Sequence, residues 1–368
     1  MRVIVVGGGI MGLGAAWALC RAGHEPVVYE QGPIPNPLAS SCDEHRLTRF
    51  TYGAMTGYAR MVHAAHAAWD RLWADLGRSH FQPSGTLVVA RADDGWVRAS
   101  KRCLEAMALP VEIWSPAVLA ERLPFLTFEH ASFALFTPTG GVLFARRILE
   151  DLGRWLRRLG VALHANRRVT EIDLDRAAIR LADGRADRGD ALVVAAGPWS
   201  PDLVPGLRGR ITPSRQVALY LEPPPETLPA WRAAPMVLDQ IEAARGGFYA
   251  VPPADGTPLK VGDHGFSLRG HPDLERAPSD ADRACVMAVA QSRLVGFERY
   301  RALEAKTCFY SIAEDERFVV EPRGRAWLLA GFSGHGFKFG AVIGEAIAAA
   351  LSGERPAAAI TAWAAGHG

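Results

Sequence analysis

The start of the chain carries the apolar pattern of a single β-α-β unit. Residues 2–6 read RVIVV, a β-branched run that predicts a parallel strand buried on both faces. Glycines follow, and apolar residues then recur at helical spacing over residues 10–21, with Gly23 as the expected helix stop. Residues 26–30, PVVYE, predict a second short strand. Strand, helix and strand in this order predict the opening of an α/β sheet.

A long amphipathic helix and a series of short strands are predicted next. Apolar residues between Met55 and Trp73 recur at helical spacing and predict a helix over residues 55–77. The pattern then changes to short strand-like segments separated by turn residues, which favours a largely antiparallel sheet. These predicted strands are residues 85–91, 131–136, 214–222, 246–251 and 258–262.

Other segments have the pattern of the first unit and lie between and after these strands. They predict that the chain leaves a nucleotide-binding domain, builds a second domain, returns, leaves again and finishes in the first. The predicted helices are residues 146–159 and 342–351, the strands are residues 161–165, 191–195 and 327–330, and residues 331–340 form a glycine-rich loop.

Charge and composition exclude several classes of protein. The chain has 368 residues and a net charge of +2, with 41 basic and 39 acidic residues scattered along it, so neither nucleic acid nor an anionic membrane is an expected partner. No apolar stretch reaches the ~18 residues that a membrane span needs. Glycines interrupt the apolar start at once, which argues against a signal peptide and makes the cytoplasm the expected location.

The five cysteines predict neither a disulfide framework nor a metal site. Their number is odd and no C-x-x-C pair occurs. A reducing compartment fits this usage best.

Gly7-x-Gly9-x-x-Gly12 lies between the first strand and the first helix. The first glycine permits the tight turn, the second lets the backbone approach a pyrophosphate, and the third lets helix and strand pack closely. Glu30 ends the second strand, where a carboxylate can bind ribose hydroxyls. Together these residues predict dinucleotide binding, but they do not separate FAD from NAD.

Four later segments point to FAD, because with them the chain resembles the sarcosine oxidase and N-methyltryptophan oxidase branch of the D-amino-acid-oxidase-like flavoenzymes. The resemblance spans nearly the whole chain. It rests on Ser40-Ser41-x-x-x-x-Arg46-x-x-Arg49-x-x-Tyr52-Gly53, on Phe248-Tyr249-Ala250-Val251-Pro252 with Leu259-Lys260-Val261-Gly262-x-His264, on Lys306-Thr307-Cys308-Phe309-Tyr310, and on Gly331 to Phe339.

The resemblance implies an α/β fold with a Rossmann-like FAD-binding domain and a mainly antiparallel α+β substrate domain. The FAD domain is expected over residues 1–80, 143–212 and 305–368, and the substrate domain over 81–142 and 213–304. The expected cofactor-binding residues are Gly7, Gly9, Ile10, Met11, Gly12, Glu30, Gln31, Ser40, Ser41, Arg46, Val169, Gly197, Trp199, Cys308, Gly334, Gly336, Phe337 and Lys338.

The resemblance also implies roles for particular side chains. Cys308 is expected to carry the flavin through a thioether, and a nearby base such as Lys306 suits a nucleophilic thiolate. Lys260 is expected over the flavin, where its charge assists the reaction with oxygen. Arg49 and Lys338 are expected to clamp a substrate carboxylate.

Further polar residues are expected at or near the pocket. Arg46 is expected near the flavin, where it favours the reduced anion. His264 and Tyr249 are candidate pocket-lining groups, and His45 and His335 are weaker candidates. Each of these residue types has a common alternative, a surface ion pair for an arginine and a structural role for a histidine.

The loop before Arg46 departs from the family pattern. It reads Cys42-Asp43-Glu44-His45, where the residue at Cys42 is often histidine and the two adjacent acids are unfamiliar. The departure bears on the shape and charge of the substrate entrance. Arg269, just past His264, is a candidate for binding a second carboxylate, as in iminodiacetate, or else faces solvent.

The resulting hypothesis is an FAD-dependent oxidase of a small secondary amino acid, with O2 as acceptor and hydrogen peroxide as product. The expected state is a monomer. Three alternatives stay open: a D-amino-acid oxidase or flavin-dependent dehydrogenase on the same fold, an NAD-dependent dehydrogenase, and a non-catalytic flavin-binding subunit of a larger complex.

Overall fold

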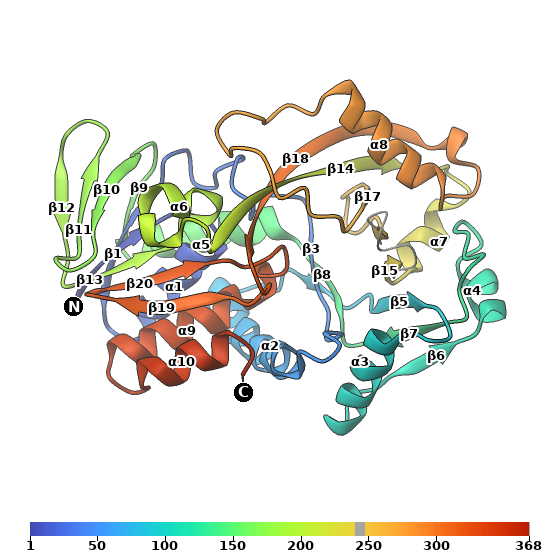
Figure 1. Ribbon diagram of the computed structural model, residues 1–368, viewed down its shortest axis with the longest axis horizontal. Coiled ribbons are helices and arrows are strands. Elements are labelled where there is room, and N and C mark those ends of the chain that lie inside the picture. Colours follow the sequence, from blue (N-terminus) through green and yellow to red (C-terminus); the bar gives the residue numbers. More distant parts are fainter. Residues whose placement is uncertain (240–246, 368) are drawn as a thin grey trace.

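The first sheet is assembled from the opening β-α-β unit and four later strands (Figure 1). The computed structural model describes residues 1–239 and 247–367. Within them, neighbouring strands of this sheet are parallel except β19 and β20, which pair antiparallel. The order is β19 (Val319–Arg323), β20 (Ala326–Ala330), β13 (Ala191–Val194), β1 (Arg2–Val6), β2 (Glu25–Tyr29) and β9 (Ala162–His164).

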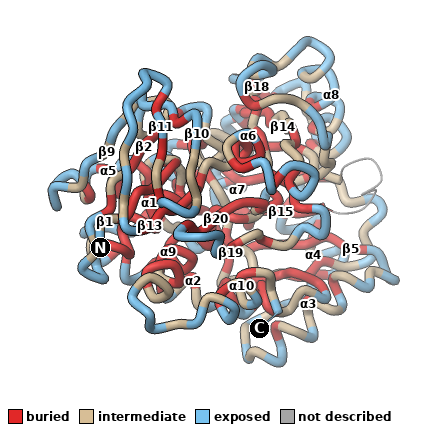
Figure 2. Tube along the Cα trace, turned by 60° about the vertical axis from the view of Figure 1, so that its left-hand side comes forward, coloured by how far each residue is buried: buried red, intermediate tan, exposed pale blue. Residues whose placement is uncertain are grey.

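Both faces of this sheet are covered, which explains why strand β1 is apolar throughout. Val3 and Val5 point into the core formed with helices α1 (Ile10–Arg21), α5 (Ala145–Arg158) and α9 (Gly340–Leu351). Ile4 and Val6 point to the opposite face, into a core shared with β10 (Val169–Asp173) and β11 (Ala178–Leu181). With β12 (Ala186–Arg188), these two strands form a small antiparallel sheet. Figure 2 shows buried residues concentrated along α1, α9, β13 and β20.

The second large sheet is mainly antiparallel, as the sequence predicts. Among the described strands of this eight-stranded sheet, only the pair β15 and β5 is parallel. The order is β18 (Arg301–Ala313), β14 (Ile211–Glu222), β17 (Leu259–Gly262), β16 (Phe248–Val251), β15 (Met236–Asp239), β5 (Thr86–Ala90), β7 (Phe133–Thr137) and β6 (Glu112–Trp114).

Two long strands, β14 and β18, connect the two cores. Ile211 and Ala313, paired with each other, lie in the core of the six-stranded sheet. Leu219 and Ala305, also paired, lie in the core of the eight-stranded sheet. The domain boundaries expected at 212/213 and 304/305 therefore fall inside strands, because each strand runs continuously from one core to the other. The division of the chain into two domains stays a prediction.

Most of the predicted elements are present with small shifts at their ends. The helix predicted over 55–77 is α2 (Thr56–Leu76), and the one predicted over 342–351 begins at Gly340. The strand predicted over 246–251 is β16, which begins at Phe248. Residue 246 of that prediction lies outside the described part of the chain. Helix α8 (Asp280–Gln291) was not predicted, because only Val286 and Ala290 are buried and its apolar stripe is weak. The remaining elements are β3 (Arg46–Thr48), β8 (Gly141–Leu143), β4 (Phe81–Gln82), α3 (Gly95–Ala106), α4 (Pro116–Arg122), α6 (Ser200–Leu203), α7 (Leu228–Ala233) and α10 (Ala357–Ala364).

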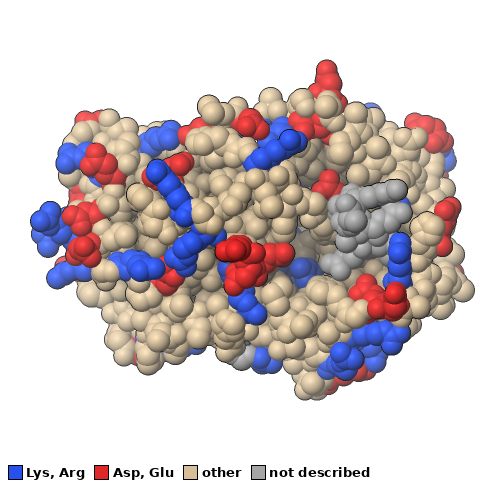
Figure 3. All heavy atoms as spheres, in the orientation of Figure 1, with Lys and Arg blue, Asp and Glu red and all other residues tan. Residues whose placement is uncertain are grey.

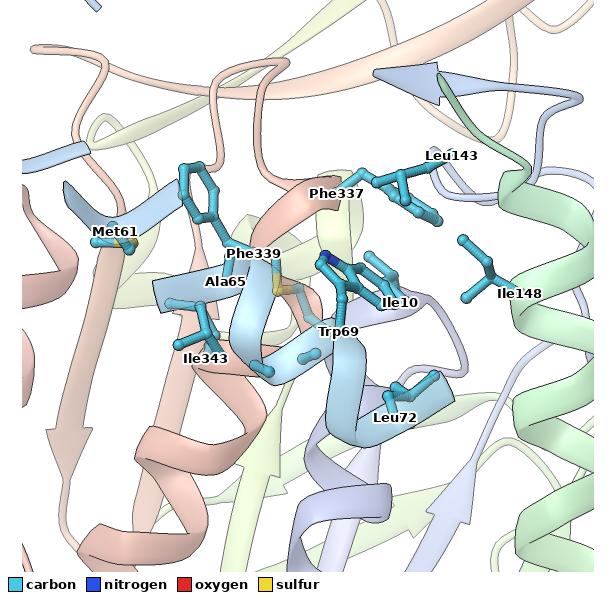
Figure 4. Packing of buried hydrophobic residues seen from close by; sticks show 14 of the residues in the cluster. Ile10, Met61, Ala65, Trp69, Leu72, Leu143, Ile148, Phe337, Phe339 and Ile343 are labelled. Carbon is cyan, nitrogen blue, oxygen red and sulfur yellow. The ribbon is translucent and has the colours of Figure 1, made fainter. Parts of the chain in front are cut away.

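The glycine-rich loop before α9 is held against α2 (Figure 4). It contains a short 3-10 helix, η5 (Phe337–Phe339), whose two phenylalanines are buried in the same core as Trp69 of α2. The Trp69 indole Nε1 donates a hydrogen bond of 2.7 Å to the carbonyl of Lys338. The backbone that carries the Lys338 side chain is therefore tied to a rigid helix.

Acidic and basic side chains are interspersed on the face that Figure 3 shows. Over the described residues, no helix is both long and apolar enough to cross a bilayer.

Candidate active site

The turn after β1 has room only for glycine at two of the three predicted positions. Gly7 has a φ of +109°, and a Cβ there would lie 2.3 Å from the carbonyl oxygen of Ala195. A Cβ on Gly12 would lie 1.9 Å from the carbonyl oxygen of Gly7, so α1 packs directly on the turn. Gly9 is the N-cap of α1 and offers no side chain to the free N–H groups. The start of α1 is therefore open to an anionic ligand.

Glu30 is held beside this turn. Its carboxylate accepts hydrogen bonds from the backbone N–H of Gly8 at 2.7 Å and from Asn36 Nδ2 at 2.9 Å. Ser41 Oγ accepts from the N–H of Ile10 at 3.0 Å. The carboxylate is thus fixed at the carboxyl end of β2, where a ribose hydroxyl would approach.

A cavity follows this turn and encloses about 1080 Å³ of space, including the part open to solvent. Most of the predicted cofactor-binding residues line it, whereas Gly12 packs behind the turn and both Cys308 and Lys338 line a neighbouring cavity. The predicted residues that line it are Gly7, Gly9, Ile10, Met11, Glu30, Gln31, Ser40, Ser41, Arg46, Val169, Gly197, Trp199, Gly334, Gly336 and Phe337.

The same cavity has walls that the sequence interpretation missed. Tyr29 and Arg168 lie beside Glu30 and Val169, and Phe309 follows Cys308. A signal for Tyr29 was available, since it precedes Glu30 at the end of a predicted strand. No such signal was available for Phe309, because its place in the cavity wall depends on how β18 crosses the cavity.

The second cavity, of about 1600 Å³ including the part open to solvent, adjoins the first. Five residues line both: Ala39, Arg46, Tyr310, Gly334 and Phe337. All of the predicted catalytic residues line the second cavity, namely Arg49, Tyr249, Lys260, His264 and Lys338. The fold therefore brings the predicted cofactor residues and the predicted catalytic residues to two adjoining spaces.

Lys338 is a buried cation and Arg49 a half-buried one, and both lack an ion pair within the described part of the chain. The Lys338 Nζ donates to Tyr52 Oη at 3.0 Å and to the carbonyl of His335 at 2.8 Å. Arg49 donates to the carbonyl of Thr51, and its guanidinium lies 4.5 Å from the centre of the Tyr52 ring. Burial and the charge of Arg49 hold the pKa of Lys338 well below its usual value. A bound anion would relieve the repulsion between these two cations.

Lys260 projects from β17 into the same cavity and is only 8% exposed. Its Nζ lies 2.6 Å from the Asp43 Oδ2, which also accepts from Arg46. Tyr220, the β14 partner of Lys260 in the sheet, donates to the other Asp43 oxygen. Burial lowers the pKa of Lys260, and the charge of Asp43 opposes this shift. The acidic loop that departs from the family pattern thus supplies the ion-pair partner of Lys260.

Cys308 lies on β18 opposite Gln216 of β14. Its Sγ is 3.8 Å from the Arg46 Nη2, and Arg46 lines both cavities. The thiol therefore faces a cation beside the junction of the two cavities. Lys306, the base expected near it, places its Nζ 3.4 Å from the carbonyl of Cys42.

The histidines near the site are neutral at physiological pH. Burial lowers the pKa of His264 to about 4 and of His45 to about 3, and holds that of His335 well below its usual value. The His264 and Tyr249 rings are 5.3 Å apart in the cavity wall. His45 and His335 line the cavity as well, whereas Arg269 is exposed and is not among the described residues lining either cavity.

A glycine turn with an open helix N-terminus, leading into a cavity with buried cations, defines a dinucleotide-dependent enzyme. The family model described as FAD dependent oxidoreductase, DAO, matches residues 2–350. The chain belongs to this family of FAD-dependent enzymes. The glycine turn, Glu30 and the 1080 Å³ cavity fit the cofactor that the family implies.

Similar proteins extend over nearly the whole chain. The monomeric sarcosine oxidase of Bacillus sp. (strain B-0618) is 26% identical over 364 residues, covering 96% of this chain and 92% of that protein. The N-methyl-L-tryptophan oxidase of Yersinia pestis (strain Pestoides F) is 27% identical over 362 residues, covering 96% and 95%. The crystal structure of L-proline dehydrogenase from P. horikoshii aligns with a TM-score of 0.81 at 20% identity, covering 100% of this chain and 96% of that one, which shows the shared fold.

Proposed function

We propose that the protein oxidises a small secondary amino acid, an N-methyl or imino acid such as sarcosine or a related N-substituted glycine. The products would be an imine, which hydrolyses to aldehyde and amine, and hydrogen peroxide from O2. The observation that carries this proposal is the pair of cations Arg49 and Lys338, unpaired within the described residues, in a cavity that adjoins the dinucleotide cavity. The names of the two oxidases similar in sequence support the same substrate class.

The residues of the second cavity suit the binding of such a substrate. Arg49 offers a planar fork and Lys338 a point charge to the carboxylate. Burial around them excludes water and strengthens both contacts. The same positive charges lower the pKa of the substrate amine, which must be neutral to react. Tyr249 and His264 line the same cavity and would contact the bound amino acid.

Bound FAD supplies the two-electron chemistry. Lys260 and Arg46 place positive charge near the place where the two cavities adjoin. This charge would stabilise the negative charge that the cofactor and O2 gain on reduction. The role of Lys260 is to stabilise the reduction of O2, and the role of Arg46 is to stabilise the reduced anionic cofactor.

Cys308 is proposed to carry the flavin covalently. The Arg46 guanidinium lies 3.8 Å from Sγ, at the side of the cavity where the cofactor residues and the thiol meet. The thioether bond replaces the S–H bond of Cys308 and one C–H bond of the flavin 8α-methyl group. Two protons leave, and the two electrons released pass to the flavin ring and then to O2.

The test is to incubate the purified yellow protein with secondary amino acids, D-amino acids and primary L-amino acids, and to measure peroxide. Peroxide with an N-methyl or imino acid, lost in Arg49→Ala, is the expected result. Peroxide with D-amino acids alone would replace the proposed substrate class. Bleaching of the flavin band without peroxide would indicate a dehydrogenase, and no bleaching with any amino acid would contradict an amine-oxidising function.

A further inference from the structure

Asp43 lies at the centre of a buried cluster that the resemblance does not account for. The residue is only 6% exposed. Its Oδ2 accepts from the Lys260 Nζ at 2.6 Å and from Arg46, and its Oδ1 accepts from the N–H of Glu44 at 2.8 Å and from the Tyr220 hydroxyl. Four donors thus converge on one carboxylate. Burial raises the pKa of Asp43, but the charges of Arg46 and Lys260 outweigh it, so the carboxyl is ionised.

Lys260 depends on this carboxylate for its charge. Within the described residues, Asp43 is its only hydrogen-bonding and ion-pair partner. The same carboxylate pairs with Arg46, so the like charge of Arg46 also acts on Lys260. The other titratable groups that face Lys260 are Tyr220 and Tyr249, whose ring centres are 5.9 and 6.0 Å from Nζ, together with His45 and Cys308. Burial raises the pKa of both tyrosines, which are therefore uncharged.

We propose that Asp43 is a positioning residue that keeps Lys260 protonated and holds its ammonium group in place at the junction with the cofactor cavity. This inference rests on the proposed function, in which Lys260 assists the reduction of O2. The carboxylate sits between two buried cations and stabilises both. Without that carboxylate, burial and the like charge of Arg46 both favour the neutral amine of Lys260.

The variant Asp43→Asn keeps the shape of the side chain and removes its charge. Lys260 should then release its proton at a lower pH than in the parent, because the charge that opposes the effects of burial and of Arg46 is gone. Glu44→Gln is the matched control. It removes the adjacent acidic charge, but Glu44 pairs with the half-exposed Arg146 at 2.8 Å and does not contact Lys260.

Sulfite provides a readout that does not depend on turnover, since this small anion adds to bound flavin and bleaches it. Its dissociation constant is measured from pH 6 to pH 9 for Asp43→Asn and for the double variant Asp43→Asn, Lys260→Met. The ratio of the two constants cancels the protonation of sulfite itself. We expect sulfite binding in Asp43→Asn to exceed that in the double variant by about tenfold at low pH, and the difference to vanish at high pH.

The corresponding ratio for the parent and Lys260→Met should stay constant across the same pH range, and Glu44→Gln should behave as the parent. A flat ratio in the Asp43→Asn pair, or a titrating ratio in the parent pair, overturns the inference. If Asp43→Asn does not hold FAD, the comparison of the parent with Lys260→Met decides the test: a ratio that changes between pH 6 and pH 9 still overturns the inference. A parent that carries no flavin would instead refute the proposed function, and the two failures are therefore distinct.

Discussion

Replacing Lys338 by methionine separates a ligand-binding role from a structural one. A ligand-binding role predicts weaker carboxylate binding with little change in stability, whereas a structural role predicts a large loss of unfolding free energy. The lysine is only 2% exposed and donates to Tyr52 Oη and to the carbonyl of His335. Methionine has a similar length and no charge, so it removes both a buried cation and its repulsion from Arg49.

The expected loss is in binding. Removing one partner of a buried ion pair costs about 2–5 kcal/mol, and about 1.4 kcal/mol corresponds to tenfold in affinity. A small carboxylate such as acetate should therefore bind about 30-fold to 4,000-fold more weakly. The affinity is measured by titrating the yellow protein and following the flavin absorbance.

The free energy of unfolding should respond differently. The two neutral acceptors left behind cost about 1 kcal/mol each, whereas the buried charge and its repulsion from Arg49 are relieved. The ligand-free variant should thus unfold in urea with a free energy no more than about 1 kcal/mol below that of the parent.

Lys306→Met is the matched control. Lys306 lines the same cavity, and the Nζ contact it makes is 3.4 Å to the carbonyl of Cys42. Unchanged carboxylate affinity in Lys338→Met, or an equal loss in Lys306→Met, would refute the clamp. A stability loss of several kcal/mol, on the order of a core truncation, would assign Lys338 a structural role instead.

Three further predictions concern the cofactor and the pH dependence. Cys308→Ala should lose the flavin that stays with the acid-precipitated parent protein, and flavin retained in the variant places the linkage elsewhere. Gly12→Ala should purify with less flavin and unfold earlier, since its Cβ would lie 1.9 Å from the Gly7 carbonyl oxygen; Gly206→Ala, with open space around the new Cβ, is the control. Burial lowers the pKa of His45 to about 3, so between pH 6.5 and 3 the unfolded chain binds a proton that the folded chain does not. The parent should lose about 2 kcal/mol of unfolding free energy through this residue between pH 6.5 and pH 5, and His45→Gln should not, as urea denaturation at the two pH values will test.

Local patterns were sufficient for much of this fold. The apolar run of β1, the glycine turn and the helix α1 are contiguous, and each follows from sterics and periodicity over a few residues. The long helix α2 is equally readable, since its apolar stripe repeats over 21 residues. Helix α8 was missed because so little of it is buried. Strand β18 was not predicted and the start of β14 was predicted at 214 instead of 211, because no turn marks the point where these strands pass from one core to the other.

The composition of the site was predicted from motifs, whereas its electrostatics depend on the tertiary structure. Asp43 and Lys260 are 217 positions apart, and Trp69 and Lys338 are 269 apart. Nothing in a local pattern states that the acidic residue of one loop will neutralise the lysine of a distant strand, or that Arg49 and Lys338 will be left without one. Pairing and desolvation are set by which segments the folded sheets bring together, and charge at buried sites follows from that arrangement.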